Sequence, residues 1–374
     1  MLFQIPPLSD QELEVIRRID EVREALRYRF TDQRRWVGLL RRVTLARGIQ
    51  GSNSIEGYNV SLDDAVAAAG GEEPLEAETE AWAAVVAYRD AMTYVLQLAD
   101  DPHVAIDESL IRSLHFIMLR YDLDRSPGRW RPGPIYVRDE RTQDIVFTGP
   151  DALQVPGLMG ELVADLEANE PTTPAMVQAS MAHLNLVMIH PFRDGNGRMA
   201  RCLQTLVLAR EGVIEPPFAS IEEYLGANTD AYYRVLAEVG GGGWHPERDA
   251  RPWLRFVLTA HYRQAHTLVV RADEAERRWE GITDLVRRRR LPERAAAPMF
   301  NSAQGLRLRN ASYRSLAEVD EAQASRDLKA LVGAGLLEAV GERRGRYYMA
   351  SEDVKVMELK IRLERKPIPD PFEL

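Results

Sequence analysis

Apolar residues recur every three or four positions along most of the chain, a spacing that predicts helices rather than strands. The first helical stretch is expected over residues 9–48, where Gly48 and Gly51 favour its end. Further helices are expected over 76–98, 107–121, 151–168, 174–189, 198–212 and onward to about residue 290. The stretch 174–189 is strongly apolar, so we expect it to run through the core. The predicted fold class is mainly α.

The helical pattern is interrupted between residues 127 and 148. Pro127-Gly128 and Pro132-Gly133-Pro134 exclude a continuous helix there. Two short runs that favour strands, 135–137 and 145–148, flank a polar turn. This pattern predicts a small β-hairpin, which holds the only strands expected in the first two thirds of the chain.

From about Leu291 onward the pattern predicts a separable unit of helix, turn, helix and terminal hairpin, the parts of a winged helix. Its elements are expected at 315–319, 321–332, 336–340 and 346–349. The tetraglycine 240–243, which interrupts the preceding helices, is interpreted as a flexible connector. We divide the chain into an N-terminal helical region, a core, a connecting helix and a C-terminal domain. Their ranges are 1–105, 106–266, 267–290 and 291–374.

Composition narrows the class of protein. The 374 residues suffice for two or three domains, and 45% hydrophobic with 28% charged residues is ordinary for a soluble globular protein. We find neither a signal peptide nor an apolar run long enough for a membrane span. Cys202 is the only cysteine, which excludes an intramolecular disulfide and favours a cytoplasmic location. The net charge of −9 argues against nucleic-acid binding by the molecule as a whole and leaves a local basic patch open.

The chemistry concentrates in residues 190–201, His-Pro-Phe-Arg-Asp-Gly-Asn-Gly-Arg-Met-Ala-Arg. Gly195 and Gly197 permit backbone angles that expose consecutive N–H groups just before a new helix, which is a setting for phosphates. Arg198 and Arg201 are three apart and face one side of that helix. Asp194 offers a hard oxygen for Mg²⁺. His190 has a pKa range suited to a general base. Together these residues are suited to phosphoryl transfer.

Each residue also has a purely structural interpretation. A histidine beside an apolar helix is often a core or capping residue, and Gly-x-Gly is often only a turn. Two arginines at helical spacing often form a solvated face. These structural interpretations are less favoured here, because all of the residues occur together in one contiguous stretch. A Walker phosphate-binding loop is excluded, since its Gly-x-x-x-x-Gly-Lys-Ser/Thr string does not occur in this chain.

The 190–201 string resembles the signature of the Fic family, His-Pro-Phe-x-Asp/Glu-Gly-Asn-Gly-Arg-x-x-Arg, at every fixed position. The resemblance implies a helical core with a hairpin flap, and transfer of AMP from ATP to a Tyr, Thr or Ser hydroxyl of a target protein. It implies that His190 is the general base and that Asp194 holds Mg²⁺. The nucleotide-binding residues implied by the resemblance are Arg193, Gly195, Asn196, Gly197, Arg198 for the γ-phosphate and Arg201 for the β-phosphate.

Upstream, Ser52, Glu56 and Gly57 match the family's inhibitory pattern Ser/Thr-x-x-x-Glu-Gly/Asn. The resemblance implies that Glu56 forms a salt bridge with Arg198, so that the γ-phosphate cannot reach this guanidinium. The structural alternative is a helix that simply ends at Gly57.

Other resemblances concern partners. The hairpin 135–148 is similar to the family's flap, which pairs with an extended segment of the target. The segment 220–228, with Asn228 and Tyr232, resembles the part that flanks adenine, and core packing is the alternative for Tyr232. The C-terminal domain is similar to winged helices appended to Fic proteins. From Arg307 to Tyr348, eight basic less six acidic residues give +2, so DNA binding, protein docking and homodimer formation all stay open.

Three functions are therefore weighed for the chain. The first is an adenylyltransferase inhibited by Glu56, and the second uses the same site to remove AMP. The third is an ATP-responsive transcription regulator with a DNA-binding winged helix. His190 and Asp194 favour chemistry, because a sensor needs no base.

Overall fold

The computed structural model describes residues 1–373 except 32, 33, 100, 102, 139–141, 169–172, 211, 213, 214, 343 and 344. The fold is mainly helical, as predicted. The first helices are α1 (Asp10–Thr31), α2 (Arg35–Ile55), α3 (Leu62–Gly70), α4 (Thr79–Leu98), α5 (Glu108–Leu119) and α6 (Val155–Ala168). They are followed by α7 (Ala175–Ile189), α8 (Asn196–Ala209), α9 (Pro216–Ala219), α10 (Glu222–Ala227), α11 (Thr229–Gly240) and α12 (Arg251–Arg288).

The C-terminal part contains α13 (Ala296–Ala303), α14 (Asn310–Ala317), α15 (Glu321–Gly333) and α16 (Glu352–Arg362). The strands are β1 (Tyr136–Arg138), β2 (Ile145–Thr148), β3 (Leu337–Val340) and β4 (Tyr347–Ala350). The described residues also include the short 3-10 helices η1 (Leu123–Arg125), η2 (Ala152–Gln154) and η3 (Glu293–Ala295). No helix in the described ranges is both long enough and apolar enough to cross a membrane.

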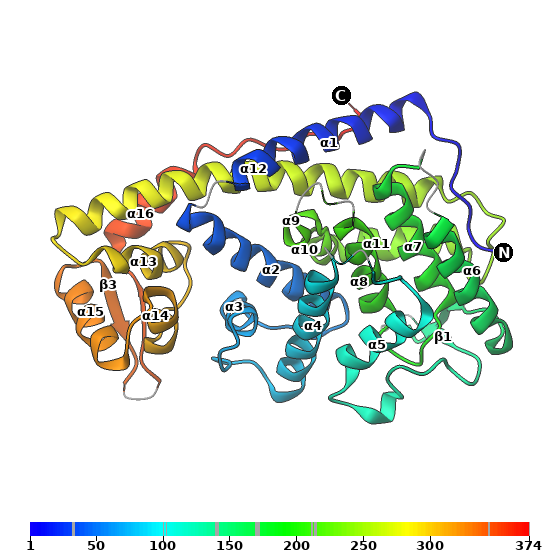
Figure 1. Cartoon of the computed structure of the whole chain (residues 1–374), viewed down its shortest axis with the longest axis horizontal. Helices are drawn as coiled ribbons and strands as arrows, with labels where there is room; N and C mark the ends of the chain where they lie inside the picture. Colours follow the sequence, from blue (N-terminus) through cyan, green and yellow to red (C-terminus); the bar gives the residue numbers. More distant parts are fainter. Residues whose placement is uncertain are drawn as a thin grey trace.

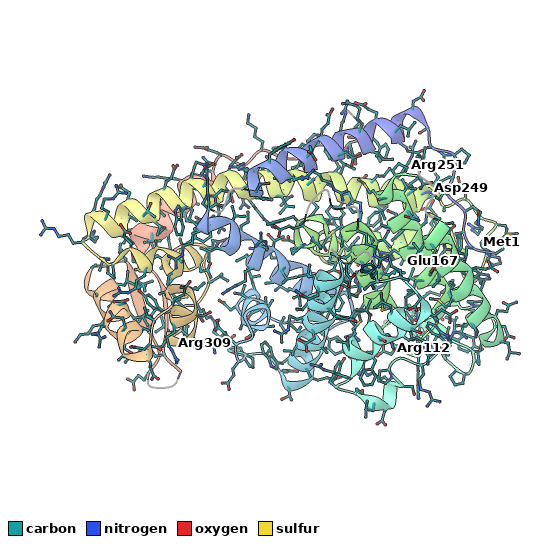
Figure 2. All side chains as sticks on the ribbon, viewed as in Figure 1. Met1, Arg112, Glu167, Asp249, Arg251 and Arg309 are labelled. Carbon is teal, nitrogen blue, oxygen red and sulfur yellow. The ribbon has the colours of Figure 1, made fainter. Side chains whose placement is uncertain are left out.

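The long helix α12 runs along the molecule with α1 beside it, and the other elements lie on one side of this pair (Figure 1). Arg251 lies at the N-terminal end of α12 (Figure 2). Arg251 and Arg255 pair with the buried carboxylate of Glu12 on α1 at 2.9 and 3.0 Å. Because α12 continues from the central helices to the C-terminal elements, the boundary predicted at residue 266 falls inside one helix. The division of the chain into domains stays a prediction.

Helix α2 differs from its prediction in a way that matters for the site. Residues 9–48 do not form one helix, and α2 continues through Gly48 and Gly51 to Ile55. These glycines serve close packing rather than termination. A Cβ added at Gly51 would lie 2.6 Å from the backbone oxygen of Glu222, and one at Gly226 would lie 2.6 Å from the Gly51 Cα. The backbones of α2 and α10 are thus in contact one turn before α2 ends.

The predicted hairpin is present as the antiparallel pair β1–β2, and its tip at 139–141 lies outside the described residues. The tetraglycine is not simply a connector. Gly241 and Gly242 adopt positive φ values of 58° and 87°, and the Gly242 oxygen accepts a hydrogen bond of 3.1 Å from the Thr148 N–H. The turn after α11 therefore binds the end of β2, and free φ angles at glycine allow this turn.

The C-terminal elements α14, α15, β3 and β4 follow in the predicted order, while α13 and α16 were not predicted. Strands β3 and β4 pair antiparallel, and Leu308 exchanges backbone hydrogen bonds of 2.9 and 2.8 Å with Tyr348. Arg343 and Arg344, counted in the local charge, lie outside the described residues. Buried residues of these elements belong to the same hydrophobic cluster as those of α1, α2 and α7.

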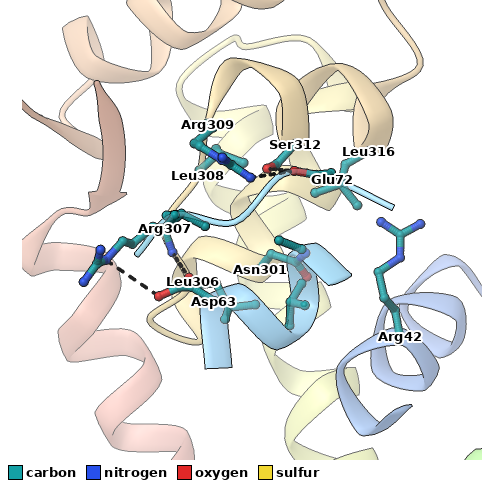
Figure 3. A pocket seen from close by; sticks show the side chains of 13 residues that line it. Arg42, Asp63, Glu72, Asn301, Leu306, Arg307, Leu308, Arg309, Ser312 and Leu316 are labelled. Atoms are coloured by element: carbon teal, nitrogen blue, oxygen red, sulfur yellow. Dashed lines mark hydrogen bonds and ion pairs between the residues drawn. The ribbon is translucent and has the colours of Figure 1, made fainter. Parts of the chain in front are cut away.

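A polar contact joins the C-terminal elements to α3 and the acidic segment after it (Figure 3). The Arg307 N–H donates to Asp63 at 2.6 Å, and its guanidinium pairs with Glu76. Arg309 donates to the Glu73 oxygen at 2.7 Å, and the Ser312 hydroxyl to Glu72 at 2.6 Å. Asp63, Glu72 and the three C-terminal residues line a cavity of about 30 Å³, which is too small for a nucleotide.

Candidate active site

The site begins where the buried helix α7 ends. Its last residue is Ile189, and His190 caps the helix with a left-handed φ of 52° and an N–H bonded to the Leu186 oxygen at 3.0 Å. Pro191 cannot continue the helix. The chain therefore turns sharply at His190, which places the imidazole at the edge of the core.

The imidazole of His190 is arranged as a hydrogen-bond acceptor. Its Nδ1–H donates to the Val187 oxygen at 3.0 Å, which leaves the lone pair on Nε2. Burial lowers the pKa of His190 below its ordinary value, with a further contribution from Arg131, and the hydrogen bond to Val187 and the charges of Glu56 and Asp194 oppose this shift. A neutral imidazole with an available Nε2 suits a general base.

Arg131, which the sequence did not single out, fixes the backbone of His190. Its guanidinium donates to the His190, Gly133 and Pro150 oxygens at 2.8, 2.7 and 2.5 Å, and only 4% of the residue is exposed. Gly133 and Pro150 flank the two ends of the β1–β2 hairpin. Arg131 thus joins the base of this hairpin to the histidine. A charged residue inside the Pro- and Gly-rich tract 127–134 was the signal for it.

His115 on α5 packs against the 190–201 loop, and the sequence analysis did not single it out either. Its ring stacks on Phe192 with centroids 3.6 Å apart. Nδ1 accepts from the Gly128 N–H at 2.8 Å, so Nε2–H donates to the Asp194 oxygen, also at 2.8 Å. Burial lowers the pKa of His115 to about 4, which keeps this tautomer neutral. A histidine on the apolar face of the predicted helix 107–121 was the available signal.

Gly195 and Asn196 shape the loop. Gly195 has a φ of 74°, and a Cβ there would lie 2.8 Å from Cδ1 of Leu119. The Asn196 amide is used by the loop itself, because it accepts from the Phe192 N–H at 2.8 Å and donates to the Phe192 oxygen at 2.9 Å. The expected contact of the Asn196 side chain with phosphate stays a prediction. The N–H groups of the first turn of α8 form a candidate anion site, because the helix itself offers no acceptors for them.

Arg198 and Arg201 are both only 1% exposed, so the interpretation as a solvated face is wrong for them. Arg201 donates from Nε to the Ser52 hydroxyl at 2.7 Å and from Nη2 to the Ser52 backbone oxygen at 2.9 Å. The Arg198 guanidinium lies over the Tyr58 ring, 5.1 Å from its centroid. In the described structure, Nε of Arg198 and Nη1 of Arg201 have no hydrogen-bond partner. Two buried cations with unused donors are suited to an anionic ligand.

Glu56 follows the last residue of α2 and reaches the first turn of α8. Its Oε1 accepts from Nη2 of Arg201 at 2.7 Å. A Cβ added at Gly197 would lie 2.5 Å from the same oxygen, so Gly197 is needed for this approach. The carboxylate therefore lies against the helix terminus that favours anions.

The partner of Glu56 differs from the prediction, which was Arg198. Ser52 and Glu56 are one helical turn apart, and Ser52 already binds Arg201, so the carboxylate meets the same guanidinium. The interpretation of the motif as a helix end also applies. Gly57 has a φ of 82°, and its N–H bonds to the Ser54 oxygen at 3.1 Å.

Asp194 offers a carboxylate beside this anion site. Its Oδ1 accepts from the Gly195 N–H at 2.7 Å, and its Oδ2 from Arg125 at 2.5 Å. Burial opposes ionisation, but Arg198, Arg125 and the Gly195 N–H lower the pKa of Asp194 below its ordinary value. No three metal-binding side chains gather anywhere in the described ranges. A single carboxylate beside a phosphate site fits Mg²⁺, which binds through one or two carboxylates and substrate phosphates.

The remaining predicted residues contact other parts of the protein. Arg193 is exposed and donates to the Asp124 oxygen at 3.2 Å. The Asn228 amide donates to the Tyr224 oxygen at 2.8 Å between α10 and α11. Tyr232 is 1% exposed and its hydroxyl bonds to His183 at 2.9 Å, which agrees with the core-packing alternative.

Comparison with known proteins matches the region just described. Residues 105–208 match the model of the Fic/DOC family. The protein adenylyltransferase Fic of Nematostella vectensis is 27% identical over 262 residues, 68% of this chain and 55% of that protein. The protein adenylyltransferase fic-1 of Caenorhabditis briggsae is 36% identical over 117 residues, 30% of this chain and 21% of that protein. The chain thus spans about half or less of the length of these relatives.

Solved structures show the same fold at low sequence identity. A Fic family protein from Desulfovibrio desulfuricans G20 superposes with a TM-score of 0.59 at 22% identity, covering 93% of this chain and 98% of that one. Fic-1 from C. elegans superposes with a TM-score of 0.51 at 24% identity, covering 68% and 72%.

Proposed function

We propose that this chain, a Fic/DOC family protein homologous to protein adenylyltransferases, transfers AMP from ATP to a hydroxyl group of a target protein. The observation that supports this best is the neutral His190 imidazole, with an available Nε2, at the start of the loop that leads to the α8 terminus. The target oxygen attacks the α-phosphorus of ATP, and its proton passes to Nε2. The bond from the α-phosphorus to the bridging oxygen breaks, and pyrophosphate leaves.

The groups around the α8 terminus have distinct roles in this proposal. The N–H groups of the first turn and the guanidiniums of Arg198 and Arg201 hold the phosphates. Asp194 would hold Mg²⁺, which neutralises charge on the phosphates and on the leaving pyrophosphate. Ser52 fixes Arg201 and His115 fixes the loop, so these two groups are already in position once Glu56 has been displaced.

We further propose that Glu56 inhibits the reaction. Its carboxylate occupies Arg201 and lies against Gly197, where a phosphate oxygen of ATP would have to be placed. Two anions cannot share one guanidinium and one helix terminus without repulsion. ATP must therefore either displace Glu56 or bind in a pose that is not in line for attack.

The β1–β2 hairpin is the proposed docking edge for the target. Tyr136, Ile145 and Val146 are 49%, 48% and 42% exposed, so apolar side chains are available beside the strand edges. An extended segment of a target can add to such an edge through backbone hydrogen bonds. Arg131 joins both ends of the hairpin to His190, so a target bound there lies in register with the base.

The test compares the wild type with Glu56→Gly and His190→Ala. Each is incubated with labelled ATP, Mg²⁺ and a cell lysate, and the labelled protein bands are quantified. We expect Glu56→Gly to raise AMP transfer at least about tenfold, equivalent to a barrier lower by about 1.4 kcal/mol. His190→Ala should abolish the label. Labelling that persists without the imidazole would contradict the assignment of the base, and an unchanged rate in Glu56→Gly would contradict the inhibition.

A further inference from the structure

Arg125, the last residue of η1, contacts the carboxylate assigned to the metal. Its Nη1 donates to Oδ2 of Asp194 at 2.5 Å and to the Tyr58 hydroxyl at 2.6 Å. On its other side, Nε donates to Asp122 at 2.7 Å and Nη2 pairs with Glu80 at 3.1 Å. The guanidinium is thus held between the site and two carboxylates outside it. None of the roles proposed above uses Arg125.

This contact engages the second oxygen of Asp194. Oδ1 already accepts the Gly195 N–H, so both carboxylate oxygens have donors. Mg²⁺ binds a carboxylate oxygen at 2.0–2.1 Å and demands near-ideal octahedral geometry. A guanidinium only 2.5 Å from Oδ2 brings a like charge close to any cation on that oxygen, and the two repel each other. Metal binding and the Arg125 contact therefore oppose each other.

Tyr58 links this contact to the inhibitory motif. It lies two residues after Glu56, and its N–H bonds to the Asn53 oxygen at 3.0 Å, within the turn that ends α2. Its hydroxyl accepts from Arg125, and its ring lies under Arg198. One turn of chain thus contacts Arg201 through Glu56, and both Arg198 and Arg125 through Tyr58.

We propose that Arg125 is an internal counter-ion of Asp194, held by Tyr58, which competes with Mg²⁺ for Oδ2 while the inhibitory turn is docked. When the metal arrives with ATP, Arg125 leaves Oδ2 and keeps its pairs with Asp122 and Glu80, so no charge is left without a partner. The inhibitory turn then opposes ATP binding in two ways. Glu56 competes with the phosphates for Arg201, and Tyr58 holds Arg125 where it competes with the metal for Asp194. The inference rests on the proposed function, because it assumes that ATP and Mg²⁺ share this site.

The test measures binding without catalysis, in the full chain with His190→Ala as the background. Calorimetry gives the affinity for a non-hydrolysable ATP analogue in EDTA and in excess Mg²⁺. The affinity in Mg²⁺ divided by the affinity in EDTA is the metal coupling. We expect Arg125→Gln to raise this coupling about tenfold. Tyr58→Phe should raise it by a smaller factor, because the ring stays on Arg198 while the hydroxyl is lost. Arg120→Gln is the matched control, since Arg120 pairs with Asp90 instead of Asp194.

Each other outcome is informative. If Arg125→Gln weakens binding equally in EDTA and in Mg²⁺, Arg125 binds phosphate, and the proposal is wrong. Unchanged coupling in Arg125→Gln and Tyr58→Phe also overturns it, while leaving the proposed function intact. Should Arg125→Gln fail to fold, as judged by circular dichroism, the Tyr58→Phe result decides. If no variant binds the analogue under either condition even after Glu56→Gly is added, the proposed function fails together with this inference.

Discussion

Arg131 shows how a residue outside the 190–201 loop determines its geometry. Its guanidinium bridges three carbonyl oxygens that belong to the hairpin base and to His190. The sequence predicted the loop residues because their chemistry is contiguous. It gave little indication of Arg131, Arg125 or His115, because each acts on backbone or side-chain atoms that are distant in sequence. Such contacts become visible only when the fold is known.

We expect Arg131→Lys to lower kcat for AMP transfer about tenfold or more, because an ammonium group cannot bridge the same three oxygens. Hydrogen bonds to charged groups contribute about 1.5–3 kcal/mol each. The KM for ATP should change little, because Arg131 does not contact the α8 terminus. Initial rates over a range of ATP concentrations, in the Glu56→Gly background, separate the two constants. Arg17→Lys on the exposed face of α1 is the control, because Arg17 pairs only with Glu14 and Glu21 in the described structure. A kcat equal to that of the control would exclude the positioning role.

The packing of α2 against α10 determines where Glu56 lies. The sequence predicted a helix there but placed its end near Gly48 and Gly51, because glycine more often interrupts helices than packs them. In the structure Gly51 lies against the backbone of Glu222 and Glu223, and α2 continues one turn further to present Ser52 and Glu56 to α8. An error of one turn in the predicted end of a helix does not change the position of a residue in the middle of that helix. It matters here because Glu56, the residue proposed to inhibit the site, directly follows the last residue of α2.

A Cβ at Gly51 would lie 2.6 Å from the Glu222 oxygen and 2.9 Å from the Glu223 Cα, so the two backbones must separate. We expect Gly51→Ala to lower the free energy of unfolding by about 1–3 kcal/mol, measured in urea, and to raise basal AMP transfer as Glu56 moves. Gly38→Ala on the same helix is the control. Its Cβ meets nothing within 4 Å, and it should stabilise by up to about 1 kcal/mol. Equal effects of the two substitutions would contradict close packing at Gly51.

Glu222 on α10 makes this region sensitive to pH. It is buried, which raises its pKa to about 7, and Oε1 accepts from the Tyr88 hydroxyl at 2.6 Å. A carboxyl with a raised folded pKa stabilises the fold below its unfolded pKa of about 4.5, and this contribution is lost as pH rises through about 7. The full loss is on the order of 3 kcal/mol.

Glu222→Gln removes this titration, so the stability of the wild type relative to the variant should fall between about pH 4.5 and 7. The difference between the two unfolding curves is the quantity to measure. His115 and His183, whose pKa values burial lowers to about 4 and 3, change stability in the opposite direction, and this contribution cancels in the difference. A pH-independent difference would show that Glu222 is ionised in the folded protein.

At the scale of the whole molecule, the long helix α12 connects the helices around the candidate active site to the C-terminal elements (Figure 1). The order of those elements could be predicted from alternating helix and strand patterns. The attachment of these elements to α3 through Arg307, Arg309 and Ser312 could not be predicted from the sequence. Charged and polar residues are expected to be exposed to solvent unless their partners are known. The acidic segment that binds Arg309 and Ser312 follows α3, the helix after α2. The C-terminal elements thus contact the part of the chain that follows Glu56.

The most direct test of the account is the intact mass of the purified chain after incubation with ATP and Mg²⁺. For Glu56→Gly, the account predicts a population heavier by one or more AMP groups, formed on the chain itself. The double variant with Glu56→Gly and His190→Ala should keep its unmodified mass. Equal modification of the two variants, or none in Glu56→Gly even with ATP bound, would contradict the proposal that His190 transfers AMP under the control of Glu56.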